Sequence, residues 1–470
     1  MAFIPSTEDQ WVFCQNLYKK YNILGKAGDT VKIRIDSYKN IRDITIPVVN
    51  NKLILLGANG VGKTNILEAI DSGKAEITDC DQEFERSYLL NLSLSRSRNE
   101  HYPNSNYLME IVKGRNGGTL DERIMNYLEE AYEFINRPLV RRVISDALDS
   151  IRFAEQNQEY DPSPLAITRL IILCMIYQQC LNEGKKYIIL MDTPELYAHP
   201  LMLDQITAIL NLLHKAGCLV VISTHSDRVI SKVFSRFEEL VKVSKEADGR
   251  LSIMLTDMEK VEAQIREFYG RNEYLTHSFS RSTHPDDGLV SLLNNGISSF
   301  LITALRDKII TSYFSEVIIL GEGTSEDVLF DYIDNEIHPN WISELQVGFI
   351  NCLGKSTMPL YFIFLNAIGI STFIFYDYDN NLNPVHVAFR DAFEQYHKEN
   401  RNLFREYYLN PDLEGFLNVK PPEGRRADSL VKPLQIFDYT FLNNGSAARI
   451  DELMQIMEKN ARILIERKKK

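Results

Sequence analysis

Acidic residues end two separate strand-like stretches of this chain. In SEVIILGEGTSEDVLF, Glu322 directly follows an apolar, β-branched run, and Glu326 lies one helical turn later. In STFIFYDYDNN, Asp377 and Asp379 end a second buried run, and residues two apart in an extended chain point the same way. Carboxylates gathered in one place cannot all stay ionised without cations, and oxygen-only ligands favour Mg²⁺ or Mn²⁺ over zinc. We therefore predict a divalent-metal site formed by these four acids at neighbouring strand ends; the alternative is that they are surface acids.

A glycine-rich stretch far upstream predicts a phosphate-binding loop. LILLGANGVGKTN follows an apolar run, opens a helix-like stretch and fits G-x-x-x-x-G-K-[ST] from Gly57 onward. The glycines allow backbone N–H groups to turn inward around phosphates. Lys63 would place its charge on the β- and γ-phosphates, and the Thr64 hydroxyl would coordinate Mg²⁺. The residues predicted to contact ATP here are Asn59, Gly60, Gly62, Lys63, Thr64 and Asn65.

Two further residues follow the loop in the order expected for a nucleotide site. KKYIILMD ends in Asp192, which we expect to hold Mg²⁺ through a water. CLVVISTHSDRVI places His225 at a strand tip, where it could sense the γ-phosphate. Each signal alone is weak, because many strands end in Asp and a lone His is usually structural. Their order after the loop favours the functional interpretation.

These motifs together resemble a known group of ATPases. GANGVGKTN, LMDTPELYAHP and ISTHSDRVI are similar to the ABC-type ATPase head of recombination and chromosome-maintenance proteins, and in particular to the OLD (overcoming lysogenisation defect) family of ATP-dependent nucleases. In such heads two subunits sandwich ATP, each offering a signature segment to the other's P-loop. The candidate segment here, DPSPLAITRL, keeps Ser163 but lacks the usual glycines.

One position departs from that resemblance. Related heads place a glutamate directly after the Walker B acid as the base that orients water, whereas this chain has Thr193. A threonine is a poor proton acceptor at neutral pH. Glu195 lies beyond Pro194 and would substitute only if the turn bends it inward. We expect ATP binding with slow or absent hydrolysis, so that the nucleotide acts as a clamp on a dimer.

The four acids at the strand ends resemble those of the Toprim domain found in topoisomerases, primases and OLD nucleases. In that resemblance Glu322 is the invariant acid, Asp377 and Asp379 are the metal-binding pair, and Glu326 matches the EGxxE form. Gly354 and the residue after it match a glycine-containing turn of the same group.

The same resemblance implies a glutamate and a lysine further on. NPDLEGFL supplies Glu414 and DSLVKPLQ supplies Lys432. The metals would activate water and stabilise the leaving 3′-oxygen, and Lys432 would offset charge on the phosphate. The alternatives are that Glu414 is an ordinary helix N-terminal acid, favoured by the macrodipole, and that Lys432 is an exposed lysine before Pro433.

The fold class that we predict is α/β: an ABC-type P-loop ATPase domain with a helical insertion, then a helical connector and a Toprim (Rossmann-like) α/β domain. A chain of 470 residues exceeds what one core usually supports, which agrees with this division. The expected segments are an N-terminal extension (1–29), the ATPase domain (30–257, with the insertion at about 90–160), a connector for dimerisation (258–313), the Toprim domain (314–440) and a helical, basic tail (441–470).

Composition limits the setting of the protein. The net charge of −12 argues against a long-range positive field for nucleic acid, although local patches and metal ions can still provide contacts. Six cysteines without a CxxC pair, and a start unlike a signal peptide, predict a reducing cytoplasm. The uncharged stretch MPLYFIFLNAIGISTFIFY is broken by Pro359, Asn366 and Gly369, which favours a buried helix and strand over a membrane span.

The resemblance and the residues together predict an ATP-binding, Mg²⁺- or Mn²⁺-dependent DNA endonuclease or nickase of OLD type, acting in bacterial or phage-related defence. Its expected partners are DNA, further copies of itself as a dimer or higher homo-oligomer, and a companion regulatory protein or nucleic acid of a retron-like or other defence system. No membrane is expected. The alternative is a nucleotide-switched ATPase or scaffold with a non-catalytic Toprim domain.

Overall fold

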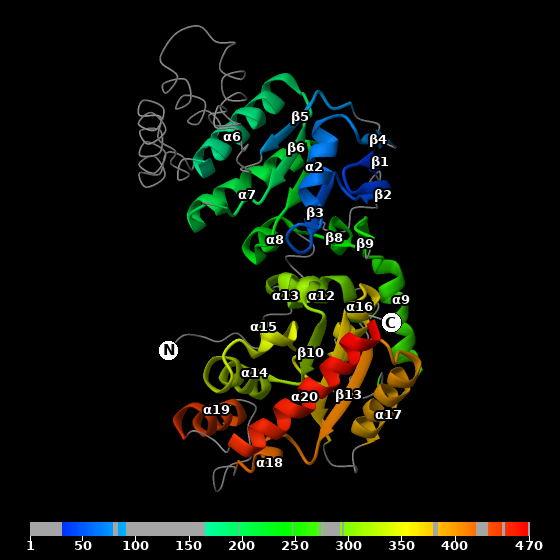
Figure 1. The fold of residues 1–470 in the computed structure, drawn as a ribbon, viewed down its shortest axis with the longest axis vertical. Helices are drawn as coiled ribbons and strands as arrows, with labels where there is room; N and C mark the ends of the chain where they lie inside the picture. Colours follow the sequence, from blue (N-terminus) through cyan, green and yellow to red (C-terminus); the bar gives the residue numbers. More distant parts are fainter. Residues whose placement is uncertain are drawn as a thin grey trace. The chain divides into compact units, whose positions relative to one another are not determined.

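The computed structural model describes residues 31–78, 83–90, 165–196, 198–246, 248–271, 275, 292–293, 296–378, 384–419, 431–443 and 447–468. The predicted N-terminal extension, the helical insertion beyond Leu90, Ser163 and Asp379 lie outside these residues. The chain divides into two compact units, Met1–Ile253 and Met254–Lys470 (Figure 1).

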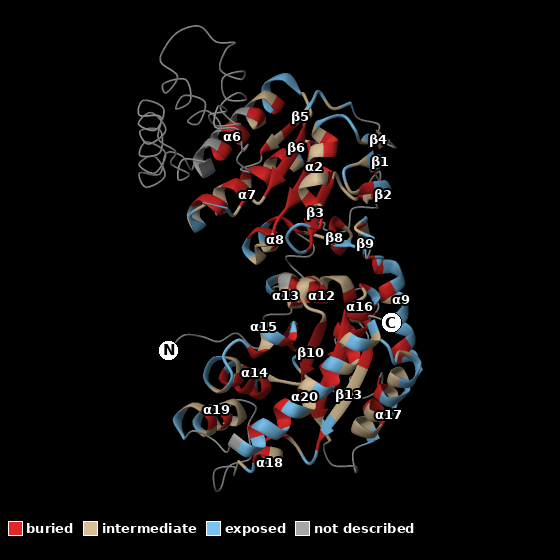
Figure 2. Ribbon diagram, viewed as in Figure 1, coloured by how far each residue is buried: buried red, intermediate tan, exposed pale blue. Residues whose placement is uncertain are grey.

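Continuously apolar runs form the central strands of the first unit. Its six-stranded sheet has the order β5-β6-β7-β3-β8-β9, and β5, β6, β7, β3 and β8 are parallel to their neighbours in that series. These strands are β3 (Lys52–Leu56), β5 (Ser87–Leu90), β6 (Ile188–Asp192), β7 (Leu219–Ser223), β8 (Leu240–Lys245) and β9 (Leu251–Leu255). Every residue of β3, β6 and β7 is buried, as expected for parallel strands covered on both faces (Figure 2).

Alternating residues form a second, antiparallel sheet in this unit, with the order β2-β1-β4. It consists of β1 (Val31–Tyr38), β2 (Ile41–Val48) and β4 (Glu76–Thr78), and its buried side chains join those of β3 and α2 in one core. The helices of the unit are α2 (Lys63–Asp71), α6 (Leu165–Glu183), α7 (Pro200–Lys215), α8 (Asp227–Val233) and the 3₁₀ turn η2 (Phe237–Glu239).

The second unit has a four-stranded sheet that is parallel throughout, with the order β11-β10-β12-β13. The strands are β10 (Val317–Gly321), β11 (Val347–Asn351), β12 (Ser371–Asp377) and β13 (Phe404–Leu409). Because all four run the same way, their carboxyl ends meet at one edge of the sheet. The predicted acids after β10 and β12 are therefore brought to the same edge.

Helices cover both faces of this sheet. They are α9 (Met258–Gly270), α12 (Ile297–Leu305), α13 (Ile309–Phe314), α14 (Thr324–Tyr332), α15 (Trp341–Leu345), α16 (Met358–Ala367), α17 (Pro384–Glu399), α18 (Leu413–Leu417), α19 (Val431–Phe437) and α20 (Ala447–Lys468), with short turns η3 (Arg306–Lys308), η4 (Ile333–Ile337) and η5 (Asp438–Leu442). On one face Leu453, Met457 and Leu464 of α20 pack against Phe373 and Phe375 of β12. The C-terminal segment thus contributes core side chains and does not form only a solvated basic tail.

The opposite face of β12 and β13 has an aromatic core. Phe362 of α16 and Phe393 of α17 contact each other and Phe268 of α9, and Phe362 also contacts Phe404. The described helices of the predicted connector therefore belong to the same compact unit as the parallel sheet. A role for them in dimerisation stays a prediction.

The predicted α/β fold class is confirmed: a unit whose parallel strands surround a glycine-rich loop between β3 and α2 precedes a second unit with a four-stranded parallel sheet. The uncharged stretch forms helix α16 and strand β12, as expected. Across the described ranges of the chain, no helix combines the length and the apolarity that crossing a membrane requires.

Candidate active site

The predicted phosphate-binding loop joins β3 to α2. Gly57 has φ +152° and any Cβ on it would collide with the carbonyl oxygen of Val243, so a glycine is required there. The Lys63 ammonium donates to the carbonyl oxygens of Gly57 (2.6 Å) and Ala58 (3.0 Å), and it lies 2.9 Å from Nε2 of His225. Since an ammonium group only donates, the imidazole nitrogen accepts this bond. The predicted sensor histidine and the predicted phosphate-binding lysine therefore meet.

Burial and the charge of Lys63 disfavour a positive charge on His225. Burial lowers the pKa of Lys63, and burial followed by the nearby Lys63 charge lowers the pKa of His225. His225 is thus held neutral and can accept a hydrogen bond. Next to this pair the Thr64 hydroxyl donates to Oδ2 of Asp192 at 2.9 Å, so the two predicted Mg²⁺-binding groups of the nucleotide site also meet. Asn65 instead donates to the Asn40 side chain at 2.7 Å.

The turn after β6, which contains Thr193, sets the direction of the Glu195 side chain. Thr193 adopts φ +43°, and its N–H donates to the carbonyl of Ser223 at the end of β7. Glu195 is thereby bent inward: its Oε1 accepts the N–H of His225 at 2.7 Å and its Oε2 accepts the hydroxyl of Thr224 at 2.8 Å. Both carboxylate oxygens are engaged with the end of β7. Glu195 therefore holds the segment that carries His225.

Arg169 of α6 supports this turn from within the core. It was not predicted from the sequence. The side chain is fully buried and donates to the carbonyl oxygens of Asp192 (2.7 Å), Thr193 (3.0 Å) and Leu90 (3.3 Å). Burial lowers its pKa to about 10, which leaves it charged at neutral pH. A single arginine inside the apolar stretch PLAITRLIILC was the signal that could have indicated it.

Removal of the Glu195 carboxylate is expected to change nucleotide discrimination. In Glu195→Ala, His225 loses the bond that fixes its backbone, so we expect the preference for ATP over ADP to fall several-fold. Loss of two partly buried hydrogen bonds to a charged group should lower the free energy of unfolding by about 2 kcal/mol. Titration calorimetry with both nucleotides and urea unfolding measure these effects. Glu76→Ala, an exposed acid of the same unit, is the control; equal ATP/ADP ratios in all three proteins would contradict the expectation.

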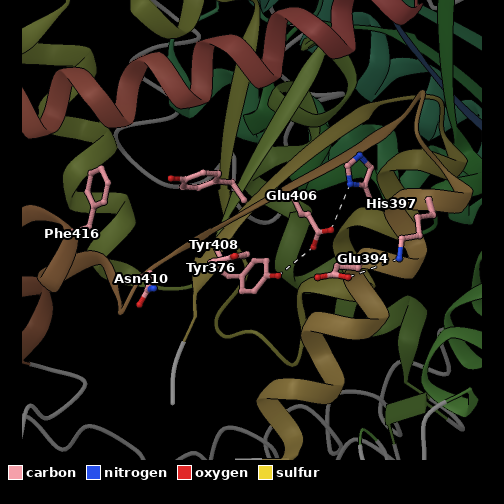
Figure 3. Close-up of a pocket in the computed structure, with 9 residues that line it drawn as sticks. Tyr376, Glu394, His397, Glu406, Tyr408, Asn410 and Phe416 are labelled. Atoms are coloured by element: carbon pink, nitrogen blue, oxygen red, sulfur yellow. Dashed lines mark hydrogen bonds and ion pairs between the residues drawn. The ribbon is translucent and has the colours of Figure 1, made fainter. Parts of the chain in front are cut away.

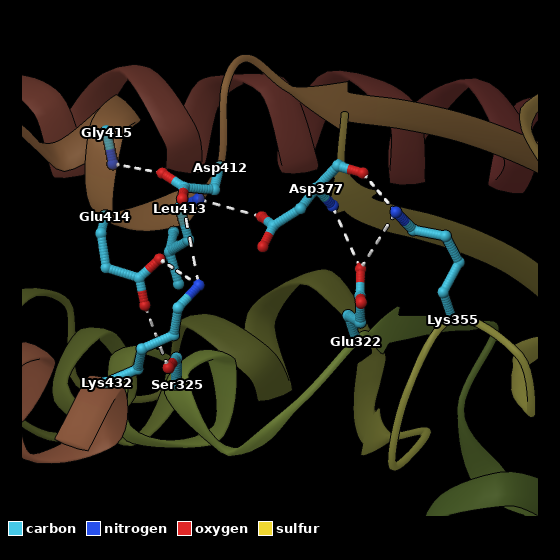
Figure 4. A network of polar contacts seen from close by, with 9 residues as sticks. All are labelled: Glu322, Ser325, Lys355, Asp377, Asp412, Leu413, Glu414, Gly415 and Lys432. Atoms are coloured by element: carbon cyan, nitrogen blue, oxygen red, sulfur yellow. Dashed lines mark hydrogen bonds and ion pairs between the residues drawn. The ribbon is translucent and has the colours of Figure 1, made fainter. Parts of the chain in front are cut away.

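The acids of the second unit meet at the carboxyl edge of its sheet (Figure 4). Oε2 of Glu322 accepts the N–H of Asp377 at 3.2 Å and lies 3.7 Å from the ammonium of Lys355. Lys355 is buried and donates to the carbonyl oxygen of Asp377 at 2.6 Å. Oδ1 of Asp377 accepts the N–H of Leu413 at 2.9 Å. The acid after β10 and the acid ending β12 are therefore neighbours, as predicted.

Glu326 lies behind them, at the start of α14. Its Oε2 accepts the N–H of Gly323 at 2.9 Å, and the residue is only 3% exposed. Burial, then the charges of Asp377 and Glu322, raise the pKa of Glu326 well above its ordinary value. Burial followed by the charge of Glu322 raises the pKa of Asp377 to about 7. The surroundings thus disfavour the ionised forms of Glu326 and Asp377.

Glu414 and Lys432 complete the predicted set. The Lys432 ammonium donates to Oε2 of Glu414 at 3.2 Å and lies 3.9 Å from Oδ2 of Asp412, while the Ser325 hydroxyl donates to Oε1 of Glu414 at 3.4 Å (Figure 4). Lys432 also lowers the pKa of Asp377, so it faces the same cluster. Asp412 was not predicted from the sequence. Its side chain accepts the N–H of Gly415 and caps the start of α18, and its place directly before Leu-Glu-Gly was the available signal.

This donor set suits a hard divalent cation. Every acidic side chain in the cluster offers oxygen ligands, and burial followed by the neighbouring acids raises the pKa values of Glu326 and Asp377, an effect that a bound cation would oppose. Among the described residues, no three His, Cys, Asp or Glu side chains are already arranged around one point as a ligand group. Lys355 and Lys432 supply the nearby positive charge in this structure, and Asp379 lies outside the residues described.

Part of the second unit resembles a known domain family. Residues 313–379 match the family described as Overcoming lysogenization defect protein-like, TOPRIM domain. This stretch is thus similar to the Toprim domain of OLD-like proteins. The chain is also 26% identical over 200 residues to the Old nuclease of Escherichia phage P2, a match that covers 42% of this chain and 29% of that protein. The matched part thus spans under a third of the relative, and the predicted resemblance to OLD proteins is confirmed.

Solved structures share parts of the fold at low similarity. UvrA2 from Deinococcus radiodurans is 10% identical to this chain, with a TM-score of 0.29. The match covers 48% of this chain and 36% of the UvrA2 chain. The RNase-L Inhibitor is 13% identical to this chain, with a TM-score of 0.30. The match covers 53% of this chain and 44% of the inhibitor chain.

A pocket of about 600 Å³ lies at β13 in the second unit (Figure 3). Glu406 of β13 lines it, accepts the Tyr376 hydroxyl at 3.3 Å and lies 3.6 Å from Nδ1 of His397. Burial, followed by the charge of Glu394, raises the pKa of Glu406 to about 7. The carboxyl group is therefore partly protonated at neutral pH.

Glu406→Gln is expected to stabilise the protein above neutral pH. Because the folded-state pKa exceeds the unfolded value near 4.5, the stability due to protonated Glu406 is fully present below pH ~4.5 and is lost as pH rises through 7. The gain in unfolding free energy of the variant over wild type should grow by about 2 kcal/mol between pH ~5 and ~8. Urea unfolding at both pH values measures it. Glu399→Gln, whose carboxyl has a lowered pKa, should show no such gain; equal gains would contradict the assignment.

Proposed function

We propose that this protein is an ATP-binding, divalent-metal-dependent DNA endonuclease or nickase of OLD type that serves bacterial or phage-related antiviral defence. The observation that carries the proposal is the convergence of Glu322, Asp377, Glu414 and Lys432 at one sheet edge, in a chain with an OLD-like Toprim domain. The Old nuclease of Escherichia phage P2, to which the chain is similar, is a nuclease by name, which supports the proposal.

The residues of the cluster have distinct parts in this proposal. Glu322, Asp377 and Glu414 would hold Mg²⁺ or Mn²⁺, with Glu326 buried behind them. A bound divalent ion supplies activation of water and stabilisation of the leaving 3′-oxygen. Lys432 directs its ammonium at the same acids and would offset negative charge on the phosphate. Lys355 fixes the backbone of Asp377 and so orients the carboxylates.

The ATPase head in this proposal binds ATP and hydrolyses it slowly or not at all. Thr193 occupies the position after Asp192, and both oxygens of Glu195 are engaged by Thr224 and His225, so neither acts as a ready base for water. The nucleotide would then act as a clamp on a homodimer or higher homo-oligomer, with a companion protein or nucleic acid as restraint. Phosphate release at rates ordinary for ABC-type ATPases would contradict this part.

The alternative is a nucleotide-switched scaffold, and one observation favours it. The lysines at the acid cluster already form ion pairs with Glu322 and Glu414, so a non-catalytic site could be stable without metal. One assay separates the two functions: supercoiled and linear DNA incubated with the full-length protein, with Mg²⁺, Mn²⁺ or EDTA, and with or without ATP. Nicking or linearisation that EDTA stops supports the nuclease. Inert protein under every condition, with ATP-dependent assembly, supports the scaffold.

A further inference from the structure

Strand β13 presents an aromatic side chain to solvent at the carboxyl edge of the sheet. Tyr408 is 43% exposed, although it belongs to a strand of the sheet. Its ring centroid lies 5.0 Å from that of Tyr378, with 40° between the ring planes. The Arg390 guanidinium lies 5.3 Å from the Tyr378 ring centroid and donates to the Tyr378 hydroxyl at 3.0 Å. Arg390 therefore fixes Tyr378, and the exposed ring of Tyr408 extends this aromatic surface.

The register of the strands fixes this pair close to the candidate metal ligands. Tyr378 directly follows Asp377, and its N–H donates to the carbonyl of Leu409 at 2.8 Å. Asp377 pairs with Leu409, and Tyr376 pairs with Tyr408. Because side chains alternate between faces, the tyrosine pair lies on the other face of the sheet from Asp377 but at the same edge. Tyr408 directly precedes Leu409, the residue paired with that acid.

The pocket at β13 continues from Tyr408 (Figure 3). Besides that tyrosine, it is lined by hydrogen-bonding side chains, among them Glu394, His397 and Glu406. An aromatic wall with polar groups around it suits a planar ligand that has hydrogen-bonding edges. A nucleobase has this chemistry. In a paired duplex the flat faces of the bases are covered by stacking, so only an unpaired base could use the Tyr408 ring.

We propose that Tyr408 stacks an unpaired nucleobase of the DNA strand whose phosphate enters the Glu322–Asp377 cluster, with Tyr378 and Arg390 supporting the ring. This inference rests on the proposed nuclease function and names its substrate class: DNA with unpaired nucleotides next to the cleaved phosphate. Base–aromatic stacking is tolerant of sequence, so the site would recognise strand opening more than a base sequence.

The test is binding of a fluorescein-labelled single-stranded oligonucleotide to the full-length protein, by anisotropy, with ATP and with Ca²⁺ in place of Mg²⁺ to avoid cleavage. Wild type should bind this strand more tightly than the duplex of the same sequence. Tyr408→Ala should weaken single-strand binding about tenfold, whereas Tyr408→Phe keeps the ring and should bind like wild type. Phe437→Ala, which removes an aromatic residue of equal 43% exposure from α19, is the matched control.

A second readout locates the base. An oligonucleotide carrying 5-iodouracil should photo-crosslink to Tyr408 in wild type, and Tyr408→Ala should lose that crosslink. The proposal is overturned if Tyr408→Ala binds the single strand as tightly as wild type, or if wild type shows no preference for it. DNA cleavage together with that result would leave the nuclease proposal standing. Tyr408-dependent binding by a protein that cuts no DNA in the separate assay with Mg²⁺ or Mn²⁺ would instead remove the nuclease proposal and keep the stacking site.

Discussion

Asp377→Asn is expected to reduce metal-dependent DNA cleavage by about a thousandfold or more. Asp377 lies between Glu322, whose carboxylate accepts its N–H, and Lys432, which lowers its pKa. The asparagine oxygen can still accept the N–H of Leu413, so the turn into α18 keeps its bond. What the substitution removes is the negative charge that a divalent ion needs.

Supercoiled plasmid with Mg²⁺ or Mn²⁺ and ATP provides the measurement, with band intensities followed over time. Asp331→Asn, an exposed acid of α14 in the same unit, should cut like wild type. Wild-type rates in Asp377→Asn would place the chemistry elsewhere in the protein and remove the acid cluster from the mechanism.

The same variant has a readout that does not depend on DNA. A ligand that binds only the folded protein raises its stability as concentration exceeds the dissociation constant, by about 2.7 kcal/mol at a hundredfold excess. Mn²⁺ should therefore raise the melting temperature of wild type and of Asp331→Asn, and have little effect on Asp377→Asn. If Mn²⁺ shifts none of the three and no DNA is cut, the scaffold interpretation gains.

Residues at the ends of buried strands could be predicted from the sequence, because the physics there is simple. A continuous apolar run indicates a parallel strand covered on both faces, and parallel strands present their carboxyl ends at one edge. Asp192, Glu322 and Asp377 each follow such a run, and each lies at the edge where it was expected. His225, which follows β7, meets Lys63 for the same reason.

Residues that depend on the path of a turn or on tertiary packing could not be predicted in the same way. The inward direction of Glu195 requires φ +43° at Thr193, a conformation that a β-branched residue rarely adopts and that Arg169 supports from the core. Lys355 bonds to a carbonyl on a strand that starts 16 residues later, and was only a weak match to a family turn. Asp412 reads in sequence as an ordinary helix cap. None of these contacts leaves a periodic pattern in the chain.

Lys63→Ala is expected to weaken ATP binding about a hundredfold or more. In the structure the Lys63 ammonium donates hydrogen bonds to the carbonyl oxygens of Gly57 and Ala58 and to the imidazole of His225. Bound β- and γ-phosphates would replace those neutral acceptors with anionic oxygens, which add the attraction between opposite charges to the hydrogen bonds. The alanine variant loses that gain and leaves the imidazole without its donor.

Binding of a fluorescent ATP analogue measures the direct effect, and Lys74→Ala, an exposed lysine of the same unit, is the control. Analytical ultracentrifugation with and without ATP measures the consequence for assembly. If ATP clamps copies of the chain together, wild type and Lys74→Ala should sediment as a larger species when ATP is added, and Lys63→Ala should not. Unchanged ATP affinity in Lys63→Ala would show that the glycine-rich turn does not bind the nucleotide. Lost affinity with unchanged assembly would separate nucleotide binding from the clamp, because the subunits would then associate through surfaces that do not depend on ATP.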